Sequence, residues 1–374
     1  MLSYIEISKK NLFHNFRAMK SLVKPGVKIA AVIKANAYGH GQNIVAKILE
    51  KEADYFQVDD IEELRSLRQV SKKKILVFGY VSKNELAEAL KLKGILCVYN
   101  KDQILSLNAV AKKIKKKAIV HIKIDAALGR QGVLLKDFPE IIKILKKCKN
   151  IIVDGVYAHF ANIEDTTDFS HAQKQLEIFN QAIKIFQKNE YKNFKTHISA
   201  SSGVMVYENN EGKSELIRLG ISLYGMWPSE DLRKRFEKQG LRLKAVMRWV
   251  THVAQVKILP KNHYIGYGLT YVTKKPTKVA IIPQGYSDGY DRGLSNKGEV
   301  LIQGQRCSVL GRVAMNMFVV DVTHIKSIKN EDEVVLLGRQ GKEEVTAEEL
   351  AKHLGTINYE ITTRITPLLK RVVK

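Results

Sequence analysis

A lysine follows directly on a strand-like apolar run in the stretch AAVIKANAYGHG, residues 30–41. Lys34 stands where a strand that begins near residue 28 should still lie in the core. An unpaired ammonium group is costly to bury, so such a lysine loses its proton or finds a partner. The stretch has two interpretations: a strand that ends at Ile33 with Lys34 in solvent, or a lysine held in a pocket that reacts as a free amine or an imine.

Other residues, most of them polar, stand at or near the ends of strand-like runs in the same way. They are Lys123, Asp125, Arg130, His159, Ser201, Arg218 and Gly220. Any one of them alone is more often a surface residue or a satisfied polar residue of the core. If the runs are strands of one barrel, the residues past their carboxyl ends meet at one face, where the active sites of such barrels lie.

The elements that would position these residues are eight short apolar runs separated by amphipathic, helix-like stretches. The runs cover residues 28–33, 54–58, 74–79, 94–99, 118–124, 151–160, 196–201 and 216–225. This alternation predicts a parallel sheet, and eight units predict an α/β fold, a closed TIM (β/α)₈ barrel. We assign residues 1–235 to the barrel. We assign residues 236–374, where strand signals separated by glycine turns dominate, to a C-terminal β domain with one short helix capped by Thr346.

Composition limits the class of protein. The 374 residues, 45% of them hydrophobic, suit two globular domains, and no apolar run is long enough to span a membrane. The net charge of +24 raises the question of nucleic acid. The lysines are spread over helix-like segments without an aromatic-interleaved motif, so we expect no nucleic-acid partner. The scattered Cys97, Cys148 and Cys307, with no secretory signal, predict a cytoplasmic protein with reduced thiols.

The stretch VIKANAYGHG closely resembles the cofactor-binding signature of the alanine racemases, a family of pyridoxal 5'-phosphate enzymes. Further matches follow in order along nearly the whole chain: KIDAALGR, HFAN, IRLGISLYG, YGLTY, IPQGYSDGY, GRVAMN and INYE. One such motif is weak evidence, but the ordered set is specific. The resemblance implies an isomerase of fold-type III that interconverts L- and D-alanine as a cytoplasmic homodimer with shared active sites. D-alanine would then supply peptidoglycan.

The resemblance assigns the cofactor to residues on both predicted domains. Lys34 matches the lysine that attaches the cofactor covalently, and Arg218 matches the residue facing its pyridine nitrogen, with His159 hydrogen-bonded behind it. Because a guanidinium only donates hydrogen bonds, this nitrogen should stay unprotonated. The matches to the phosphate ligands are Tyr38, Ser201, Gly220, Ile221 and Tyr359. The resemblance implies no metal.

The resemblance also assigns catalysis and substrate binding. Lys34 would serve the D face of the substrate and Tyr267 of the other subunit the L face, because one base cannot readily reach both. Arg130 and the backbone N–H of Met315 would bind the substrate carboxylate. Lys123 matches a lysine that the family often carbamylates, which would orient Arg130. The substrate entrance would be lined by Tyr286, Arg292 and Arg312.

The chain departs from the family pattern at two places near the proposed carboxylate site. Ala126-Ala127 stands where the family has Thr-Gly, and Ala314-Met315-Asn316 where it has Cys or Ser, Met and Asp. Substrate breadth is therefore open, and a racemase of broader specificity, acting on serine or lysine, is the alternative.

Two further alternatives come from other functional classes. Pyridoxal phosphate-dependent amino-acid decarboxylases use a similar barrel and β domain, but they carry an acidic residue at the pyridine nitrogen and a cysteine near the second base, where this chain has Arg218 and Tyr267. A cofactor-carrier protein would need only the barrel, so the β domain argues against it.

Overall fold

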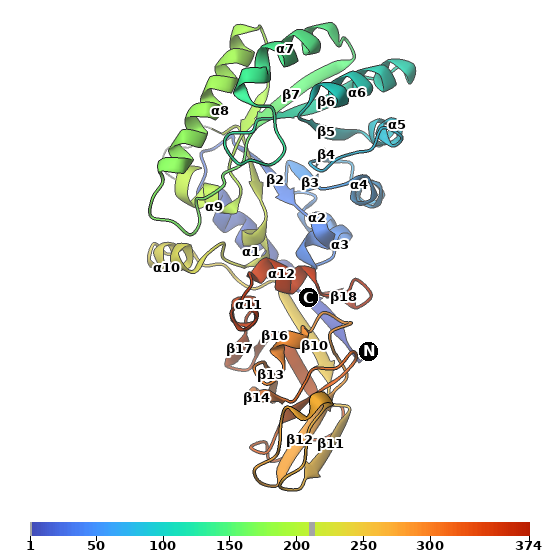
Figure 1. Ribbon diagram of the computed structural model, residues 1–374, viewed down its shortest axis with the longest axis vertical. Helices are drawn as coiled ribbons and strands as arrows, with labels where there is room; N and C mark the ends of the chain where they lie inside the picture. Colours follow the sequence, from blue (N-terminus) through green and yellow to red (C-terminus); the bar gives the residue numbers. More distant parts are fainter. Residues whose placement is uncertain (1, 209–213) are drawn as a thin grey trace.

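A parallel barrel forms one end of the molecule (Figure 1). The computed structural model describes residues 2–208 and 214–374, and in these residues eight parallel strands follow the order β8-β7-β6-β5-β4-β3-β2-β9. The strands are β2 (Lys28–Val32), β3 (Tyr55–Val58), β4 (Lys74–Val77), β5 (Gly94–Val98), β6 (Ala118–Lys123), β7 (Ile151–Tyr157), β8 (Lys195–His197) and β9 (Leu216–Leu219). Backbone hydrogen bonds from Glu215 to Thr196 and from Arg218 to Ser199 join the two ends of the sheet. The predicted barrel is therefore confirmed.

Helices cover the outside of the barrel and fill its connections (Figure 1). They are α1 (Lys9–Lys20), α2 (Lys34–Tyr38), α3 (Gln42–Leu49), α4 (Ile61–Arg68), α5 (Leu86–Lys91), α6 (Lys101–Lys113), α7 (Phe138–Lys147), α8 (Ser170–Lys188), α9 (Ser201–Gly203) and α10 (Glu230–Lys238), with short turns η1 (Leu135–Asp137), η2 (Val204–Glu208) and η3 (Ile221–Tyr224). Several begin at side-chain caps, such as Asp60 on α4, which accepts from the Glu63 N–H. In the part of the chain that the structure describes, no helix combines the length and the apolar character needed to cross a membrane.

The C-terminal domain is a mostly antiparallel sheet. Its strands follow the order β11-β12-β15-β14-β13-β16-β10-β1-β18, and β17 pairs with β16. The strands are β1 (Tyr4–Ile7), β10 (Met247–His252), β11 (Gln255–Leu259), β12 (Thr277–Ile282), β13 (Glu299–Ile302), β14 (Gln305–Leu310), β15 (Phe318–Asp321), β16 (Glu333–Gln340), β17 (Glu343–Val345) and β18 (Lys370–Val373). The turns η4 (Tyr267–Leu269) and η5 (Arg292–Leu294) lie in its loops. The prediction that the C-terminal part of the chain forms a domain of β-strands is confirmed.

The assignment of residues 1–235 to the barrel is wrong for strand β1, which belongs to the C-terminal sheet. It pairs with β10 and β18 of the C-terminal sheet and makes no barrel ladder. Ile5 and Ile7 are fully buried, whereas Tyr4 and Glu6, which alternate with them, are partly exposed. This alternation is typical of an antiparallel sheet with one covered face, while barrel strands are buried on both faces.

Two short helices, not one, belong to the C-terminal domain. The first, α11 (Ala347–Leu354), begins as predicted at Thr346, whose side chain accepts from the Glu349 N–H. The second, α12 (Asn358–Thr363), carries the INYE motif and lies at the junction with the barrel (Figure 1). The sequence prediction missed α12 because its six residues are too few to show a helical period.

The inward-facing residues of the barrel change from apolar to polar along the strands. One cluster inside the barrel is apolar and consists of Ala30, Tyr55, Leu76, Ile95 and Leu216. Two residues beyond Ile95 and Leu216 on the same face of their strands lie Cys97 and Arg218, both buried. Tyr157 contacts Cys97, Lys123 contacts Tyr157, and His197 contacts Arg218, and all three are buried as well. The barrel therefore holds a buried polar layer directly below its mouth.

Candidate active site

Lys34 opens a turn of left-handed backbone at the end of β2. Ala35, Asn36, Ala37 and Tyr38 have φ values of 51°, 52°, 54° and 53°. This conformation costs residues other than glycine about 1–2 kcal/mol each. Such strain persists only where the surroundings impose it, and it is typical of functional sites.

Hydrogen bonds of side chains to backbone tie the strained turn to the start of α3 and to α4. The Ala35 N–H donates to Glu63 Oε1 at 2.6 Å, and Asn36 Oδ1 accepts from the Gln42 N–H at 3.0 Å. Glu63 also accepts from the backbone of Asp59 at 2.7 Å, which ties the turn to the end of β3. The position of Lys34 is therefore set by groups on neighbouring barrel units.

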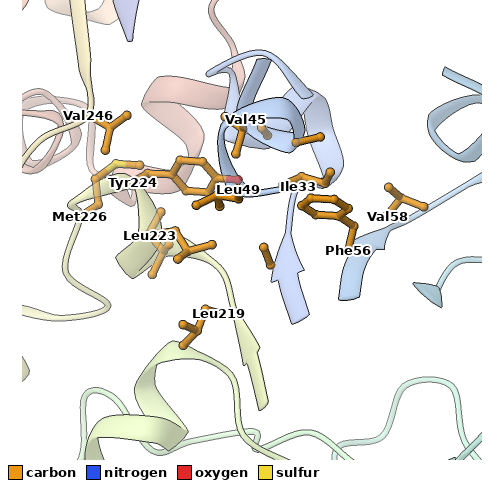
Figure 2. Close-up of a cluster of buried hydrophobic side chains, with 14 of the residues drawn as sticks. Ile33, Val45, Leu49, Phe56, Val58, Leu219, Leu223, Tyr224, Met226 and Val246 are labelled. Atoms are coloured by element: carbon orange, nitrogen blue, oxygen red, sulfur yellow. The ribbon is translucent and has the colours of Figure 1, made fainter. Parts of the chain in front are cut away.

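The residue before Lys34 anchors it to the core. Ile33 is fully buried among Val45, Leu49 and Phe56 (Figure 2). The Lys34 side chain is 41% exposed at the barrel mouth, and its Nζ lies 3.4 Å from Asp59 Oδ1. The strand does end before Lys34, as the first interpretation has it, and the ammonium group has a carboxylate partner. Sequence reasoning missed Asp59, although its place after β3 could have suggested it.

Arg218 lies buried in the barrel, and both terminal nitrogens of its guanidinium make hydrogen-bond contacts. It binds His197 Nδ1 at 2.5 Å and His159 Nδ1 at 3.1 Å, and donates to the carbonyl oxygens of Ala158 and Ile198 at 3.0 and 2.9 Å. The expected contact with His159 is present. Burial lowers the pKa of Arg218 to about 10, so the group remains charged at neutral pH. A fixed cation therefore sits below the barrel mouth.

Lys123 is a second buried cation in the same layer. Its side chain is almost inaccessible, and its Nζ lies 4.8 Å from the centre of the Tyr157 ring. Burial is the larger cause and the charge of Arg218 the next, and together they lower the pKa of Lys123 to about 8. A substantial fraction of this amine is thus neutral, and hence nucleophilic, in mildly alkaline solution.

Arg130 stands on the exposed loop that follows β6. Asp125 Oδ1 accepts from the backbone N–H groups of Leu128 and Gly129 at 2.9 and 3.0 Å, which shapes this loop. Ala127, one of the departures from the motif, has a left-handed φ of 58°. A glycine would adopt this conformation without strain. The charge of Arg130 also acts on Lys123 and lowers its pKa.

The predicted phosphate ligands gather beyond β8 and β9. Ser201 Oγ accepts from the Gly220 N–H at 3.1 Å and from the Ser222 N–H at 3.4 Å. A Cβ at position 220 would lie only 2.8 Å from the Tyr38 hydroxyl. The rings of Tyr38 and Tyr359 are 6.0 Å apart, so α12 brings Tyr359 to the group.

The chemistry of this group fits a phosphate. Burial raises the pKa of Tyr38 and of Tyr359 above the usual range, so both hydroxyls keep the proton that they can donate. Next to Ile221, the buried Ser222 hydroxyl has no hydrogen-bond partner among the described residues. Together with the Lys34 amine, these groups could hold an aldehyde cofactor that carries a phosphate.

The remaining predicted residues form a second group on the C-terminal domain. Tyr267 lies on η4 with 72% of its surface exposed, and a Cβ at Gly268 would lie 2.5 Å from Arg312 Nη1. Tyr286 donates its N–H to the Ala314 carbonyl at 3.1 Å, next to Met315. Arg292 begins η5, close to the same loop.

This second group is remote from the Lys34 group in one chain. The strands β11 and β12, which flank Tyr267, lie at the end of the molecule away from the barrel (Figure 1). Tyr267, Tyr286, Met315 and Met317 are exposed on this domain, although all four are large hydrophobic residues. The fold therefore brings the predicted residues together in two groups, and a single chain does not join them.

Comparison with known proteins gives a consistent picture. Residues 7–228 match the model of the alanine racemase N-terminal domain, and residues 246–373 match that of the C-terminal domain. An alanine racemase of Carboxydothermus hydrogenoformans is 38% identical over 373 residues, 99% of this chain and 98% of the relative. Alanine racemase 2 of Caldanaerobacter subterraneus subsp. tengcongensis is 35% identical over 371 residues, 98% and 94% of the two chains. The solved alanine racemase of Clostridium difficile 630 superposes with a TM-score of 0.93 at 33% identity, covering 100% of this chain and 96% of that one.

Proposed function

The chain belongs to the alanine racemase family of isomerases, and from this premise we propose that it interconverts L- and D-alanine with pyridoxal 5'-phosphate in an active site shared between two copies. One observation carries the proposal: Lys34, the buried Arg218 and the Ser201–Gly220 cradle converge at one barrel mouth. These are the groups that a cofactor with an aldehyde, a ring nitrogen and a phosphate requires. When bound, this cofactor withdraws electrons and thereby stabilises negative charge at the substrate Cα.

Each group would hold a different part of the cofactor. Lys34 would attach it through Nζ. Ser201, Gly220, Ile221, Tyr38 and Tyr359 would bind the phosphate through hydroxyl and backbone N–H groups. Arg218, held by His159 and His197, would face the ring nitrogen. Because a guanidinium has no acceptor and does not give up its proton, Arg218 would leave that nitrogen neutral. This argues against a decarboxylase, which would carry an acidic residue there.

Two bases would move the proton at Cα. Lys34 would take and return it on the D face, and Tyr267 of a second copy on the L face. Tyr267 is exposed and remote from Lys34 in its own chain, which supports a head-to-tail homodimer. A free phenol is a weak base at neutral pH, so Tyr267 would share its proton with neighbouring groups at the mouth, among them His159.

The substrate carboxylate would be bound by both copies. Arg130 would pair with it from the barrel, and the Met315 N–H would donate from the second copy. A carbamate on Lys123 would pair with Arg130 and orient it. Tyr286, Arg292 and Arg312 would line the entrance, where positive charge attracts an anionic group.

The remaining parts of the proposal concern the cell and the chain. All three cysteines are buried free thiols, which supports a reducing, cytoplasmic location. The D-alanine formed would be used in peptidoglycan. We propose that the boundary between the two domains lies between residues 235 and 236, with β1 as part of the C-terminal sheet.

A proton-exchange assay tests the proposed function. The protein loaded with pyridoxal phosphate is incubated with L-alanine in D₂O, and chirality and deuterium at Cα are followed. We expect D-alanine to form with deuterium at Cα, and the Lys34→Ala variant to lose this conversion. Conversion of serine or lysine at a comparable rate would favour the broad-specificity racemase. Bound cofactor without conversion of any of the three would overturn the proposal.

A further inference from the structure

A continuous chain of side-chain contacts runs from the buried Arg218 toward the opposite end of the barrel. Arg218 Nη1 lies 2.5 Å from His197 Nδ1, and His197 Nε2 lies 2.8 Å from His121 Nδ1. His121 Nε2 lies 3.2 Å from Asp154 Oδ2, and Lys195 Nζ donates to Asp154 Oδ1 at 3.0 Å. Both imidazoles are fully buried, whereas the Asp154 side chain is 20% exposed. The chain thus links the barrel mouth to a partly exposed carboxylate toward the opposite end of the barrel.

The two ends of the chain dictate where each proton lies. A guanidinium only donates, so His197 Nδ1 must accept and can carry no proton. A neutral imidazole has one N–H, so the proton of His197 is on Nε2 and is donated to His121 Nδ1. By the same argument His121 carries its proton on Nε2 and donates it to the ionised Asp154, which only accepts. Both histidines therefore have the Nε2–H tautomer, and every bond points away from Arg218.

The charge states of the three groups agree with this order. Burial, and then the charge of Arg218, hold the pKa of His197 well below the ordinary range. Burial also lowers the pKa of His121, in spite of Asp154. Burial alone would raise the pKa of Asp154, but hydrogen bonds from His121 and Lys195 hold it at about 2. At neutral pH the chain thus consists of two neutral imidazoles and one carboxylate.

The backbone is shaped to make this chain possible. The pairing of β6 and β7 passes from Val120–Val153 to His121–Gly155, which leaves Asp154 as an extra residue. Such a bulge turns a side chain away from its regular direction. A Cβ at Gly155 would lie 2.6 Å from His121 Nδ1, so only glycine leaves room for the ring. The Tyr157 ring stacks on His197 with centroids 4.9 Å apart and fixes its plane.

We propose that Asp154, His121 and His197 are positioning residues, a relay that fixes the tautomer of His197 so that its Nδ1 always accepts from Arg218 and holds the guanidinium toward the barrel mouth. The relay acts only through Arg218, and none of its members contacts a substrate. Its effect on turnover rests on the proposed function, whereas the prediction of the histidine tautomers is independent of that function.

Asp154→Asn tests the relay with a nearly isosteric change. Lys195 can only donate, so it binds the oxygen of the new amide. The amide NH₂ group then faces the N–H at His121 Nε2, and two donors meet. Each imidazole must then carry its proton on Nδ1 instead of Nε2. The Nδ1–H of His197 would then face an N–H of Arg218, with no acceptor between them. Lys195→Gln is the matched control, because it removes the ion pair and keeps both a donor and the Asp154 carboxylate. Asp154→Glu restores the acceptor.

The readout is the tautomer of each histidine in the full-length protein with ¹⁵N-labelled histidine. Long-range ¹⁵N–¹H NMR distinguishes the two tautomers, and His121→Gln and His197→Gln assign the signals. We expect Nε2–H for both residues in the wild type, in Lys195→Gln and in Asp154→Glu, and Nδ1–H or a mixture in Asp154→Asn. Under the proposed function, kcat of Asp154→Asn falls about tenfold while KM changes less than about twofold.

Several outcomes would overturn the relay. It is wrong if either wild-type histidine carries its proton on Nδ1, or if Asp154→Asn keeps the wild-type spectrum and kcat. It is also wrong if Lys195→Gln changes as Asp154→Asn does, because the ion pair then explains the effect. If Asp154→Asn changes the spectrum but not kcat, the relay sets the tautomers and has no role in turnover. If the wild type racemises no amino acid, the proposed function fails, and the spectra alone decide the relay.

Discussion

Arg371 donates two hydrogen bonds to the carbonyl oxygen of Gly39, from Nε at 3.1 Å and from Nη2 at 2.9 Å. Gly39 ends the left-handed turn that begins at Lys34, and Arg371 lies in β18 of the C-terminal domain. The same guanidinium donates through Nη1 to the carbonyl oxygens of Thr366 and Leu369 at 2.7 and 2.6 Å. Charge-assisted bonds of this kind are stronger than neutral ones. The β domain of a chain therefore supports the lysine turn of its own barrel.

Gly39→Ala tests this junction. Gly39 has a φ of 86°, and a Cβ there would lie 2.0 Å from the Thr362 carbonyl oxygen of α12. Gly240→Ala is a matched control with a φ of 89° and nothing within 4 Å of the added Cβ. Both variants carry the same backbone strain, so we expect the free energy of unfolding to fall by about 2–3 kcal/mol more in Gly39→Ala. Urea unfolding measures the difference, and equal losses would contradict a tight junction.

Ala127→Gly should stabilise the loop that carries Arg130. Ala127 has a left-handed φ of 58°, which glycine adopts freely, so the free energy of unfolding should rise by about 1 kcal/mol. Ala126→Gly is the control: Ala126 is buried and outside the left-handed region, so its loss should destabilise the protein. Urea midpoints compare the two. A lower midpoint for Ala127→Gly would show that the loop needs the Ala127 methyl group more than a relaxed backbone.

Lys123 should react with carbon dioxide in a pH range where ordinary lysines do not. Its pKa is lowered to about 8, so the neutral, nucleophilic amine accumulates as the pH rises from about 7 to 9, while an ordinary lysine near 10.4 stays protonated. At constant dissolved ¹³CO₂, we expect a carbamate signal in ¹³C NMR, besides that of the α-amino group, that grows with pH over this range. Lys123→Arg keeps the charge and should abolish this signal. A spectrum that is unchanged in this variant would assign the carbamate to another amine.

The shared active site predicts complementation between two inactive variants. Lys34→Ala and Tyr267→Ala should each lack racemase activity. When the two are unfolded and refolded together, random pairing makes half of the dimers hybrid, and each hybrid has one intact site, so about a quarter of wild-type activity should return. Lys34→Ala mixed with Arg218→Ala is the control, because both residues lie in the same barrel and no intact site can form. Equal recovery in the two mixtures, or none in the first, would count against a shared site.

Asn316→Asp tests the second departure from the family motif. Asn316 Nδ2 donates to Ser287 Oγ at 2.8 Å, and Ser287 Oγ donates to the Met315 carbonyl at 2.8 Å. An aspartate would compete for the hydroxyl proton of Ser287 and add negative charge near the proposed carboxylate site. We expect KM for alanine to rise a few-fold with kcat little changed. Asn330→Asp makes the same charge change at an exposed site elsewhere and should have no effect; an unchanged KM in Asn316→Asp would mean that position 316 is silent.

The sequence by itself determined the barrel and the residues at its mouth. Short apolar runs with helix-like stretches between them predict the parallel sheet, and the carboxyl ends of its strands meet at one face. Lys34, Arg218, Ser201 and Gly220 each follow or end a strand, so their convergence needs only the correct order of strands. These are local properties of the chain, and the motifs that carry them could be read without a structure.

Only the tertiary structure decided which residues stand behind that mouth. Asp154 lies three positions before the inward-facing Tyr157, so regular alternation would place it on the other face of β7; the bulge in the pairing with β6 turns it to His121. Likewise β1 joins a sheet whose other strands are more than 200 residues away in the chain. Register and long-range pairing depend on contacts between distant segments, and no local pattern of residues specifies them.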